Sequence, residues 1–534
     1  MNVAIFGAGI GGLTVAHELS KLPGYKIKIY ERHDAIGGVA RTIRDEYGCS
    51  IEHSWRMYLW LYRNLRSILK EIPTDGKRNV NDNLITCNLK QTLWKKRDDG
   101  VTPSEYAGIA YTYIDYITSS DKRVRDRDAW KWSNVVQRSK PRELPWECIP
   151  QWLGMDRKNG SYQSVMRVGF DLSYVETGKK PGEENQIMNQ PTSEGWFDYW
   201  QKHLESKGVE FYFNTTLESL SITSSKVQHA ITTSDGNVQA DYYVLGIPVE
   251  SLVKVVNSSG SIAGLEKMGE LADLSYAMMV CFSVNFDRPI YIDKKEDGYI
   301  LEDSPWSLII QTREVSWAKA GQPTISLCTS IPEVKGSWSI LMSNSNTPGV
   351  LYGKAFKDCS EQECRDELWA QVMQNEQLRD GVRKSNGFDL DEKYVVRWSS
   401  SWPEYKWVGD KPSTQEPKFA NNAGVLKLRP SSLLTSIPNL YISTAYTKEA
   451  LDNYSMEGAA TSGLTVAHSI SGGKTRPPTY IDRSRTLLPL QKVDEYFYSI
   501  GWPNLGPPLL VLLVFLVVFL FVIVVKRMLS RRER

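Results

Sequence analysis

The glycine-rich segment near the start of the chain has the residue types and spacing needed to bind a diphosphate. It reads Gly7-Ala8-Gly9-Ile10-Gly11-Gly12 and fills a GxGxxG pattern. In this pattern the first glycine permits a tight turn, the second lets the backbone approach a pyrophosphate, and the third lets a helix pack closely on a strand. Glu31 follows Gly12 by 19 residues. A carboxylate at that distance would accept hydrogen bonds from the adenosine ribose hydroxyls of a dinucleotide.

Three elements must position these groups. The apolar run 2–6 predicts a strand that leads directly into the glycines, and apolar residues at Leu13, Ala16 and Leu19 predict a helix over 13–20. A second strand is expected over 25–30, ending just before Glu31. Strand, glycines, helix, strand and acid follow in the order of a Rossmann-like unit. The helix N-terminus would supply unpaired N–H donors to the phosphates of NAD or FAD.

The stretch after Glu31 favours FAD. It reads Arg32-His-Asp-Ala-Ile-Gly37-Gly38-Val-Ala-Arg41-Thr42 and resembles the ExxxxxGGxxxT signature of the FAD-dependent amine oxidase, protoporphyrinogen oxidase and phytoene desaturase superfamily. The paired glycine would let the chain pass close over the cofactor, and Arg41 can neutralise its diphosphate through bidentate hydrogen bonds. The resemblance implies non-covalent FAD, because no cysteine precedes the closing strand where covalent attachment occurs.

Further blocks extend the resemblance as far as about residue 470. The block 52–56, Glu-His-Ser-Trp-Arg, is similar to the EHxxR stretch of desaturase-like members and would lie beside the isoalloxazine. It implies substrate-facing roles for His53, Arg56 and Tyr58, with packing of the cofactor loop as the alternative. The block 195–248 looks like the second FAD-domain segment, and 429–468 looks like the closing strand and helix.

The resemblance therefore implies a set of cofactor-binding residues. They are Gly7, Ala8, Gly9, Ile10, Gly11, Gly12, Glu31, Arg32, Gly37, Gly38, Arg41, Trp55, Leu217, Thr444 and Glu457. One position departs from the family. Members carry Ala-Gly-Asp or Ala-Gly-Glu at the end of the closing strand, where this chain has Ser443-Thr444-Ala445. We expect Glu457 to compensate in part for the missing acid.

The fold class implied is α/β with α+β inserts. A Rossmann-like FAD-binding domain is expected from the separated segments 1–75, 190–265 and 425–472, and a mixed substrate domain from 76–189 and 266–424. The proline-containing segment 473–508 is interpreted as a linker.

The C-terminal region predicts a membrane anchor. Residues 509–525 are consecutively apolar and long enough for one short transmembrane helix, and 526–534 form a basic tail. We expect no signal peptide, because the first strand leads directly into the glycines. These features together indicate a tail-anchored protein with a cytosolic body, similar to the mitochondrial outer-membrane anchors of monoamine oxidases. The positive-inside tendency favours the opposite orientation.

Composition excludes several other classes. Charged residues make up 24% and hydrophobic residues 41%, which is typical of a globular chain rather than a disordered one. The net charge is +2, and the tail alone carries +4. No nucleic-acid partner is expected from that balance. The seven cysteines are scattered without a CxxC pair, so free thiols and no metal site are expected.

Three hypotheses on function follow. The first is a membrane-anchored FAD-dependent oxidoreductase that removes a hydride from a hydrophobic substrate, either an isoprenoid C–C bond or an amine. The second is a catalytically degenerate flavoprotein with an interaction or structural role, motivated by Thr444 and Ala445. The third, a NAD-dependent dehydrogenase, is disfavoured by the closing block 455–463, which serves FAD.

Overall fold

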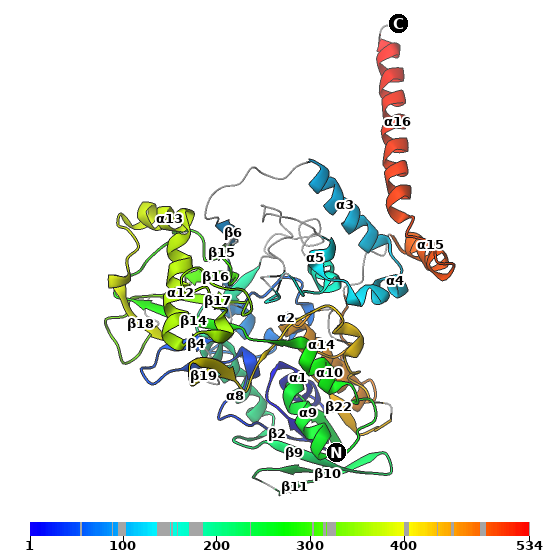
Figure 1. Cartoon of the computed structure of the whole chain (residues 1–534). Coiled ribbons are helices and arrows are strands. Elements are labelled where there is room, and N and C mark those ends of the chain that lie inside the picture. The colour runs from blue at the N-terminus through cyan, green and yellow to red at the C-terminus, as the bar shows by residue number, and fades with distance from the viewer. Residues whose placement is uncertain are drawn as a thin grey trace.

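The chain forms two β-sheet regions, a helical insert and a projecting C-terminal helix (Figure 1). The computed structural model contains all 534 residues. The structure describes residues 1–53, 56–87, 89–93, 103–135, 150, 153–156, 158–169, 185–234, 236–301, 304–312, 315, 317, 327–399, 405–434, 436–449, 453–480 and 487–532.

The first region is built on a parallel sheet of five strands in the order β22-β12-β1-β2-β8. The strands are β1 (Asn2–Phe6), β2 (Lys26–Tyr30), β8 (Glu210–Tyr212), β12 (Tyr242–Leu245) and β22 (Leu440–Ile442). Side chains alternate along a strand. Val3 and Ile5 of β1 accordingly enter one hydrophobic core, while Ala4 and Phe6 enter another on the opposite face. The sheet is buried on both sides, as parallel sheets require.

Helices from both ends of the chain cover one face of this sheet. They are α1 (Ile10–Leu19), α2 (Arg63–Leu69), α8 (Asp198–Ser206) and α14 (Met456–Ile470). A Cβ at Gly463 of α14 would lie 2.5 Å from the Thr14 Cβ and 2.7 Å from the Gly11 carbonyl oxygen. Only glycine therefore permits α1 and α14 to pack this closely.

The other face carries a small antiparallel sheet and two helices. The strands are β9 (Leu217–Thr223), β10 (Lys226–Thr232) and β11 (Gly236–Val238), and the helices are α9 (Val249–Ser258) and α10 (Met268–Ser275). The Rossmann-like α/β architecture expected from the sequence is therefore present.

The second region centres on a six-stranded sheet in the order β18-β14-β17-β16-β15-β6. Its strands are β6 (Leu89–Leu93), β14 (Val280–Phe286), β15 (Gly298–Leu301), β16 (Leu308–Thr312), β17 (Gly336–Met342) and β18 (Val395–Ser399). All pairings are antiparallel except that of β15 with β6. One face packs on α12 (Glu361–Gln374) and α13 (Glu376–Asn386), and α12 begins with a capping box of Ser360 and Glu363.

Short pairs of strands connect these parts. They are β3 (Thr42–Arg44) with β4 (Ser50–Glu52), β5 (Leu84–Thr86) with β7 (Gln186–Met188), β13 (Tyr276–Ala277) with β21 (Lys418–Phe419), and β19 (Tyr405–Val408) with β20 (Lys411–Thr414).

The helical insert comprises α3 (Pro103–Thr118), α4 (Asp121–Asp126) and α5 (Trp132–Val135). The segment interpreted as a linker contains a helix instead, α15 (Leu488–Ser499), which packs on α3 and α4. The physical reason is a buried ion pair, in which the Arg123 guanidinium lies 2.9 Å from the Asp494 carboxylate. The Asn504 amide adds hydrogen bonds to the end of α3, at Asp115, Thr118 and Ser119.

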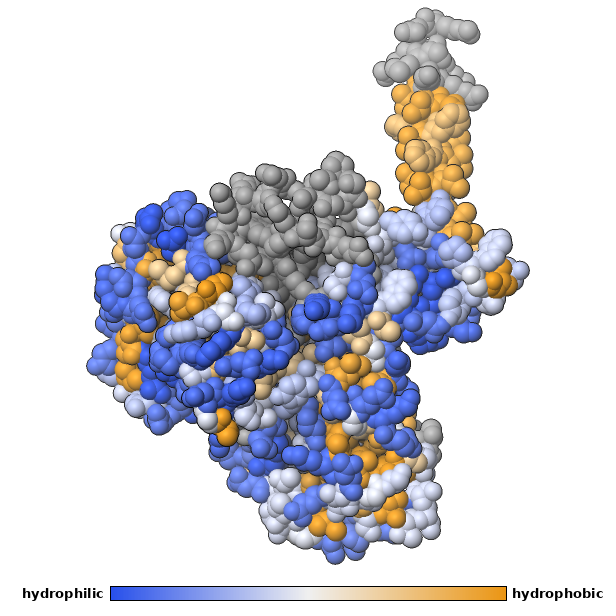
Figure 2. Space-filling model, viewed as in Figure 1, coloured by the Kyte–Doolittle hydropathy of each residue, from blue (hydrophilic) through white to orange (hydrophobic). Residues whose placement is uncertain are grey.

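The last helix, α16 (Gly506–Arg532), extends away from the body (Figure 1). Its segment Gly506–Val525 is long and apolar enough to cross a membrane by length and composition, and after its first two residues, Gly506 and Pro507, none of its described residues is buried in the protein. Figure 2 shows the part of this helix nearer the body as a hydrophobic surface. Its prolines, Pro507 and Pro508, stand in the first turn, where a missing N–H breaks no helical hydrogen bond.

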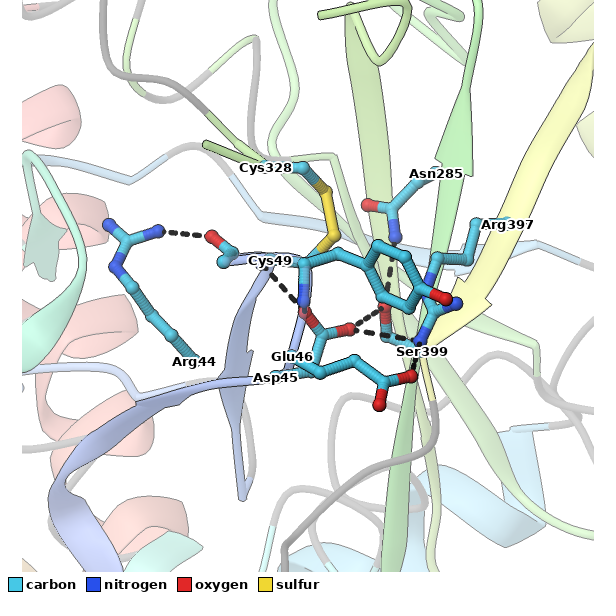
Figure 3. The surroundings of a disulfide bond; sticks show 10 residues. Arg44, Asp45, Glu46, Cys49, Asn285, Cys328, Arg397 and Ser399 are labelled. Atoms are coloured by element: carbon cyan, nitrogen blue, oxygen red, sulfur yellow. Dashed lines mark hydrogen bonds and ion pairs between the residues drawn. A yellow bond between two sulfur atoms is a disulfide. The ribbon is translucent and has the colours of Figure 1, made fainter. Parts of the chain in front are cut away.

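Two of the cysteines expected to be free form a disulfide. Cys49 and Cys328 are bonded, and Figure 3 shows this bond linking the β3–β4 hairpin to the second region. The pair is 279 residues apart, so no sequence spacing announces it. Nearby, the Asp45 carboxylate accepts hydrogen bonds from the Cys49 N–H (2.8 Å) and the Ser399 hydroxyl (3.0 Å). Cys87, Cys281, Cys359 and Cys364 are free and buried, and Cys148 lies outside the described residues.

Candidate active site

One long cavity joins the carboxyl edge of the parallel sheet to the second region. Ligands of open α/β sheets bind at this edge. Its nucleotide end is formed by the glycine loop and by the residues after β2, β8, β12 and β22. These residues are Gly7, Gly9, Ile10, Gly11, Glu31, Arg32, Thr215, Thr216, Leu217, Pro248, Ser443, Thr444 and Ala445. The other end, which we call the chamber, is lined by His53, Arg56, Met57, Leu59, Leu153, Gly154, Val168, Met279, Ile309, Leu341, Lys418 and Tyr454.

The glycines of the loop have two different duties. Gly7 has a φ of +100°, and a Cβ there would lie 2.4 Å from the Gly246 carbonyl oxygen. A Cβ at Gly11 would lie 2.0 Å from the Ser443 carbonyl oxygen, and one at Gly12 would lie 2.3 Å from that of Gly7. These three glycines are required by the packing of the protein itself.

Gly9 differs from its neighbours. The nearest heavy atom to a Cβ at this position is the Gly246 carbonyl oxygen, 3.9 Å away. A Cβ at Gly9 would therefore clash with nothing in the protein, and Gly9 itself lines the cavity. A side chain there would instead clash with a bound diphosphate, as the sequence pattern predicts.

Glu31 is fixed at the end of β2 by backbone donors. Its carboxylate accepts hydrogen bonds from the N–H of Ala8 (2.7 Å) and of His33 (3.1 Å). Burial raises the pKa of this carboxyl above its ordinary value, and the two N–H donors oppose the shift. Ala8 therefore contributes by orienting the acid and is absent from the cavity lining, while Glu31 lines the cavity.

Arg32 and His33 both engage the buried Glu416 carboxylate. The His33 ring nitrogen lies 2.7 Å from Glu416, and Arg32 forms an ion pair with the same oxygen. Burial, together with the charges of Arg41 and Arg32, lowers the pKa of His33 to about 3. The imidazole is therefore neutral at physiological pH. Arg32 lines the cavity, but its guanidinium is occupied by Glu416.

The stretch 37–41 crosses directly over the glycine loop. A Cβ at Gly38 would lie 3.1 Å from the Gly9 Cα, so the two backbones are in contact. Arg41 is buried, lines the cavity and donates a hydrogen bond to the Gly38 carbonyl (2.8 Å). This geometry places a fixed guanidinium beside Gly9. Gly37 also lines the cavity.

Polar groups left unused by the protein fit a dinucleotide at this end. The Ser443 hydroxyl is buried and has no hydrogen-bond partner among the described residues, and it lines the cavity next to the glycine loop. The N-terminus of α14 also faces the cavity through Ser455, Met456 and Ala459. A buried hydroxyl and a helix N-terminus are suited to binding phosphate and flavin oxygens.

The closing segment, in which Thr444 and Ala445 replace the glycine and acid of the family pattern, lies at the cavity as expected, but Glu457 does not. Thr444 and Ala445 line the cavity, and the Thr444 N–H donates to the Ser462 hydroxyl (3.1 Å). Glu457 lies elsewhere. Its carboxylate accepts hydrogen bonds from the N–H of Asn64 (3.0 Å) and Leu65 (2.9 Å), which caps the start of α2. These two bonds engage the carboxylate with α2, and Glu457 is not among the described residues that line the cavity.

The three residues expected to face the substrate separate into two groups. His53 and Arg56 line the cavity, but Tyr58 does not. Tyr58 forms a backbone bridge with Gln186 and packs edge-on against Trp196, with ring centroids 5.9 Å apart. Alternate residues of an extended chain point in opposite directions. Met57 and Leu59 line the chamber and Tyr58 between them is fully buried in the core behind it, whereas Arg56 also lines the cavity, so the alternation holds only for residues 57–59.

Trp55, also expected near the cofactor, lies outside the described residues.

The chamber holds a lysine that sequence reasoning missed. Lys418 of β21 lines it together with His53 and Arg56. Burial and the neighbouring Arg56 charge lower the pKa of Lys418 to about 8. Burial, with the charges of Lys418, Arg56 and Arg41, holds the pKa of His53 well below its ordinary value. Arg56 is paired, with its guanidinium 2.8 Å from the Glu52 carboxylate.

A dinucleotide end joined to an apolar chamber defines a class of cofactor-dependent oxidoreductase. Comparison with known proteins specifies it. The model of the flavin containing amine oxidoreductase family matches residues 185–471, and that of the NAD(P)-binding Rossmann-like domain matches residues 5–72. The chain belongs to the flavin containing amine oxidoreductase family, and FAD is the cofactor this membership implies.

Individual relatives match over short segments. The chain is 34% identical over 112 residues to a 15-cis-phytoene desaturase from Synechococcus elongatus, covering 21% of this chain and 23% of the relative. It is 31% identical over 86 residues to a zeta-carotene desaturase from Zea mays, covering 16% of this chain and 15% of the relative. The aligned segments thus span less than a quarter of these relatives.

Solved structures agree in fold over most of the chain. A putrescine oxidase bound to putrescine has a TM-score of 0.58 at 12% identity, covering 88% of this chain and 99% of that one. A putative protoporphyrinogen oxidase from Exiguobacterium has a TM-score of 0.54 at 15% identity, covering 89% and 99%. At these identities the likeness concerns the fold alone.

Proposed function

We propose that this protein is a membrane-anchored, FAD-dependent oxidoreductase that removes a hydride from a hydrophobic substrate. The observation that carries the proposal is the continuity of the cavity, which runs from the glycine loop to a chamber with largely apolar walls. A flavin bound by the loop would extend toward that chamber. Bound FAD supplies the hydride acceptor, and the protein supplies position and exclusion of water.

Different residues of the chain bind the cofactor and exclude water. Gly9 leaves room for the diphosphate and Arg41 offsets its charge, while Glu31 is held ready for ribose hydroxyls. The walls formed by Leu153, Val168, Met279, Ile309 and Leu341 exclude water from the reacting bond. His53 is neutral in this setting and offers a hydrogen-bonding imidazole rather than a charge. Gly37, Gly38, Leu217 and Thr444 complete the proposed cofactor contacts.

The catalytically degenerate flavoprotein remains the second candidate. It is favoured by Thr444 and Ala445, which replace a glycine and an acid of the family pattern, and by the engagement of Glu457 with α2. The unpartnered Ser443 hydroxyl supports the enzyme instead, because it offers a new donor beside the same cofactor groups.

A spectrum of the purified full-length protein tests the proposal. We expect a yellow protein that releases FAD on acid denaturation and is bleached anaerobically by a substrate of the correct class. A folded protein without flavin absorbance would overturn the proposal in favour of the degenerate candidate. A flavin-replete protein that no hydrophobic substrate reduces would do the same for the enzymatic part.

We also propose that α16 crosses the bilayer once. Its apolar length and its exposure support this, as does Trp502 just before it, an aromatic residue suited to the bilayer interface. Two orientations of the body each have support. The sequence predicts a cytosolic body at the mitochondrial outer membrane. The Cys49–Cys328 disulfide and the basic tail instead favour a body in an oxidising compartment.

Protease added to intact organelles distinguishes the two orientations. Digestion of the body would support the cytosolic orientation. Protection of the body, with mobility on a gel that shifts upon reduction, would support the oxidising compartment.

A further inference from the structure

We propose that the chamber takes an apolar substrate carrying a single carboxylate, and that Lys418 is the group that receives this carboxylate. The inference rests on the proposed function and narrows its substrate class. Neither an amine nor a plain hydrocarbon satisfies the charges that line the chamber.

Lys418 is held in the wall where three parts of the chain meet. It begins the short strand β21, which pairs with β13. Its ammonium lies 5.7 Å from the centre of the Tyr454 ring, and its Cε lies 4.0 Å from the position that a Cβ on Gly154 would occupy. Together with these neighbours, Lys418 lines the cavity.

No carboxylate neutralises this ammonium among the residues that the structure describes. Burial of the side chain and the nearby Arg56 guanidinium both lower the pKa of Lys418. Arg56 itself is matched by Glu52, and His53 is uncharged. Among the described residues, the chamber therefore keeps one positive charge that no carboxylate balances.

The two carboxylates found among the described lining residues are both at the nucleotide end. Glu31 accepts hydrogen bonds from the backbone of residues 8 and 33, and Glu416 is held by Arg32 and His33. Neither is available to a substrate in the chamber. The two ends of the cavity thus differ in charge as well as in shape.

This charge discriminates between substrate classes. An alkylammonium substrate would bring a second positive charge close to Lys418, which is costly where water is excluded. A neutral hydrocarbon would bury the ammonium without a partner, which is also unfavourable. A single carboxylate balances the charge through a charge-assisted hydrogen bond, and Leu153, Val168, Met279, Ile309 and Leu341 can bury the rest of the molecule.

Three ligands with one skeleton and different head groups test the proposal: phenylbutyrate, phenylbutanol and phenylbutylamine. Each is titrated into the full-length, FAD-loaded protein in a non-ionic detergent. Binding is measured by perturbation of the flavin spectrum and independently by calorimetry. We expect the carboxylate to bind most tightly and the amine least tightly. Equal affinities, or tightest binding of the amine, would overturn the proposal.

Variants at Lys418 identify the group responsible. Lys418→Met should weaken phenylbutyrate about ten- to a hundredfold, which is the effect of one charge-assisted hydrogen bond, and should leave phenylbutanol nearly unchanged. Lys418→Arg should retain most of the affinity for the carboxylate. Lys406→Met, which removes an exposed lysine of β19 in the same region, is the matched control and should change nothing. An unaltered affinity in Lys418→Met would overturn the assignment.

The pH profile adds a readout that a purely structural lysine would not affect. Because Lys418 is charged below its pKa of about 8, affinity for phenylbutyrate should be full at lower pH and should fall as the pH rises through that value. In Lys418→Met this fall should be absent, and its persistence there would count against the proposal.

The calorimetric arm separates this inference from the proposed function. Discrimination by Lys418 in a protein that lacks flavin would refute the oxidoreductase and leave the carboxylate site standing. A flavin-replete protein without discrimination would refute the carboxylate site alone.

Discussion

The two ends of the cavity are made in different ways. The nucleotide end consists largely of backbone, in which Gly7, Gly11 and Gly12 are fixed by contacts of 2.0–2.4 Å that any Cβ would make. The chamber consists mainly of side chains from widely separated parts of the chain, including His53, Met279 and Lys418. A binding surface made of backbone tolerates few substitutions, because most of them disturb the packing of the protein. A binding surface made of side chains can change its specificity by substitution while the fold is kept.

The largest effects on FAD binding and on folding are expected from substitutions of two glycines of the same loop. Gly9→Val should abolish FAD binding while leaving the apoprotein folded, because its side chain meets only the cavity. Gly11→Val should prevent correct folding, because its Cβ would overlap the Ser443 carbonyl oxygen. Flavin absorbance and thermal unfolding of the two variants check this. Equal behaviour of the two glycines would contradict the division of duties in the loop.

The next effect concerns the pair beneath the chamber. Glu52→Gln leaves the buried Arg56 charge without its partner and should lower the free energy of unfolding by about 3–5 kcal/mol. Glu194→Gln is a suitable control, since its partner Arg44 is about one-third exposed and the loss should be below about 1 kcal/mol. Denaturant unfolding measures both. Comparable losses would mean that the Arg56 pair is not buried in solution.

A smaller effect is expected at the nucleotide end. Ser443→Ala removes the unpartnered hydroxyl and should weaken FAD about two- to tenfold, the effect of one neutral hydrogen bond, with little change in the stability of the apoprotein. Ser436→Ala, at an exposed position, should leave FAD affinity unaltered. Equilibrium dialysis against FAD provides the measurement. Unchanged affinity in Ser443→Ala would remove this residue from the cofactor site.

The smallest effect is expected at Tyr58. Its hydroxyl is buried without a partner, so Tyr58→Phe should change the free energy of unfolding by less than about 1 kcal/mol. Ligand affinity in the chamber should also stay the same, because the ring faces the core. Titration with phenylbutyrate is the relevant measurement, and a clear loss would restore Tyr58 to the substrate side.

Local order along the chain explains which parts were predictable. The glycine loop, Glu31 and Arg41 belong to one continuous stretch, so their order in the sequence is also their order around the cofactor. Lys418 and Met279 reach the chamber only because β21 and β13 pair across more than a hundred residues of chain, and no spacing encodes that pairing. The Cys49–Cys328 bond was missed for the same reason.

Two other differences arise from tertiary contacts that override a local pattern. The segment with several prolines near the C-terminus contains α15 because Asp494 is paired with Arg123 inside the protein. Glu457 follows the family pattern in sequence but turns toward the start of α2, where two backbone donors hold it. For Tyr58 no reliable local signal was available, because its neighbours Arg56, Met57 and Leu59 all line the cavity and only the packing against Trp196 turns its ring into the core.

The close packing of α1 against α14 has a consequence for biosynthesis. The first strand of the parallel sheet leaves the ribosome early, but its edge strand β22 and the helix that seals α1 are made only when residues 440–470 have been translated. The sheet order therefore delays completion of the nucleotide end, as expected for contacts distant in sequence. The second region, with β14 to β18 within residues 280–399, can be complete earlier. A nascent chain arrested before residue 440 should thus contain a protected second region beside an open, protease-sensitive glycine loop.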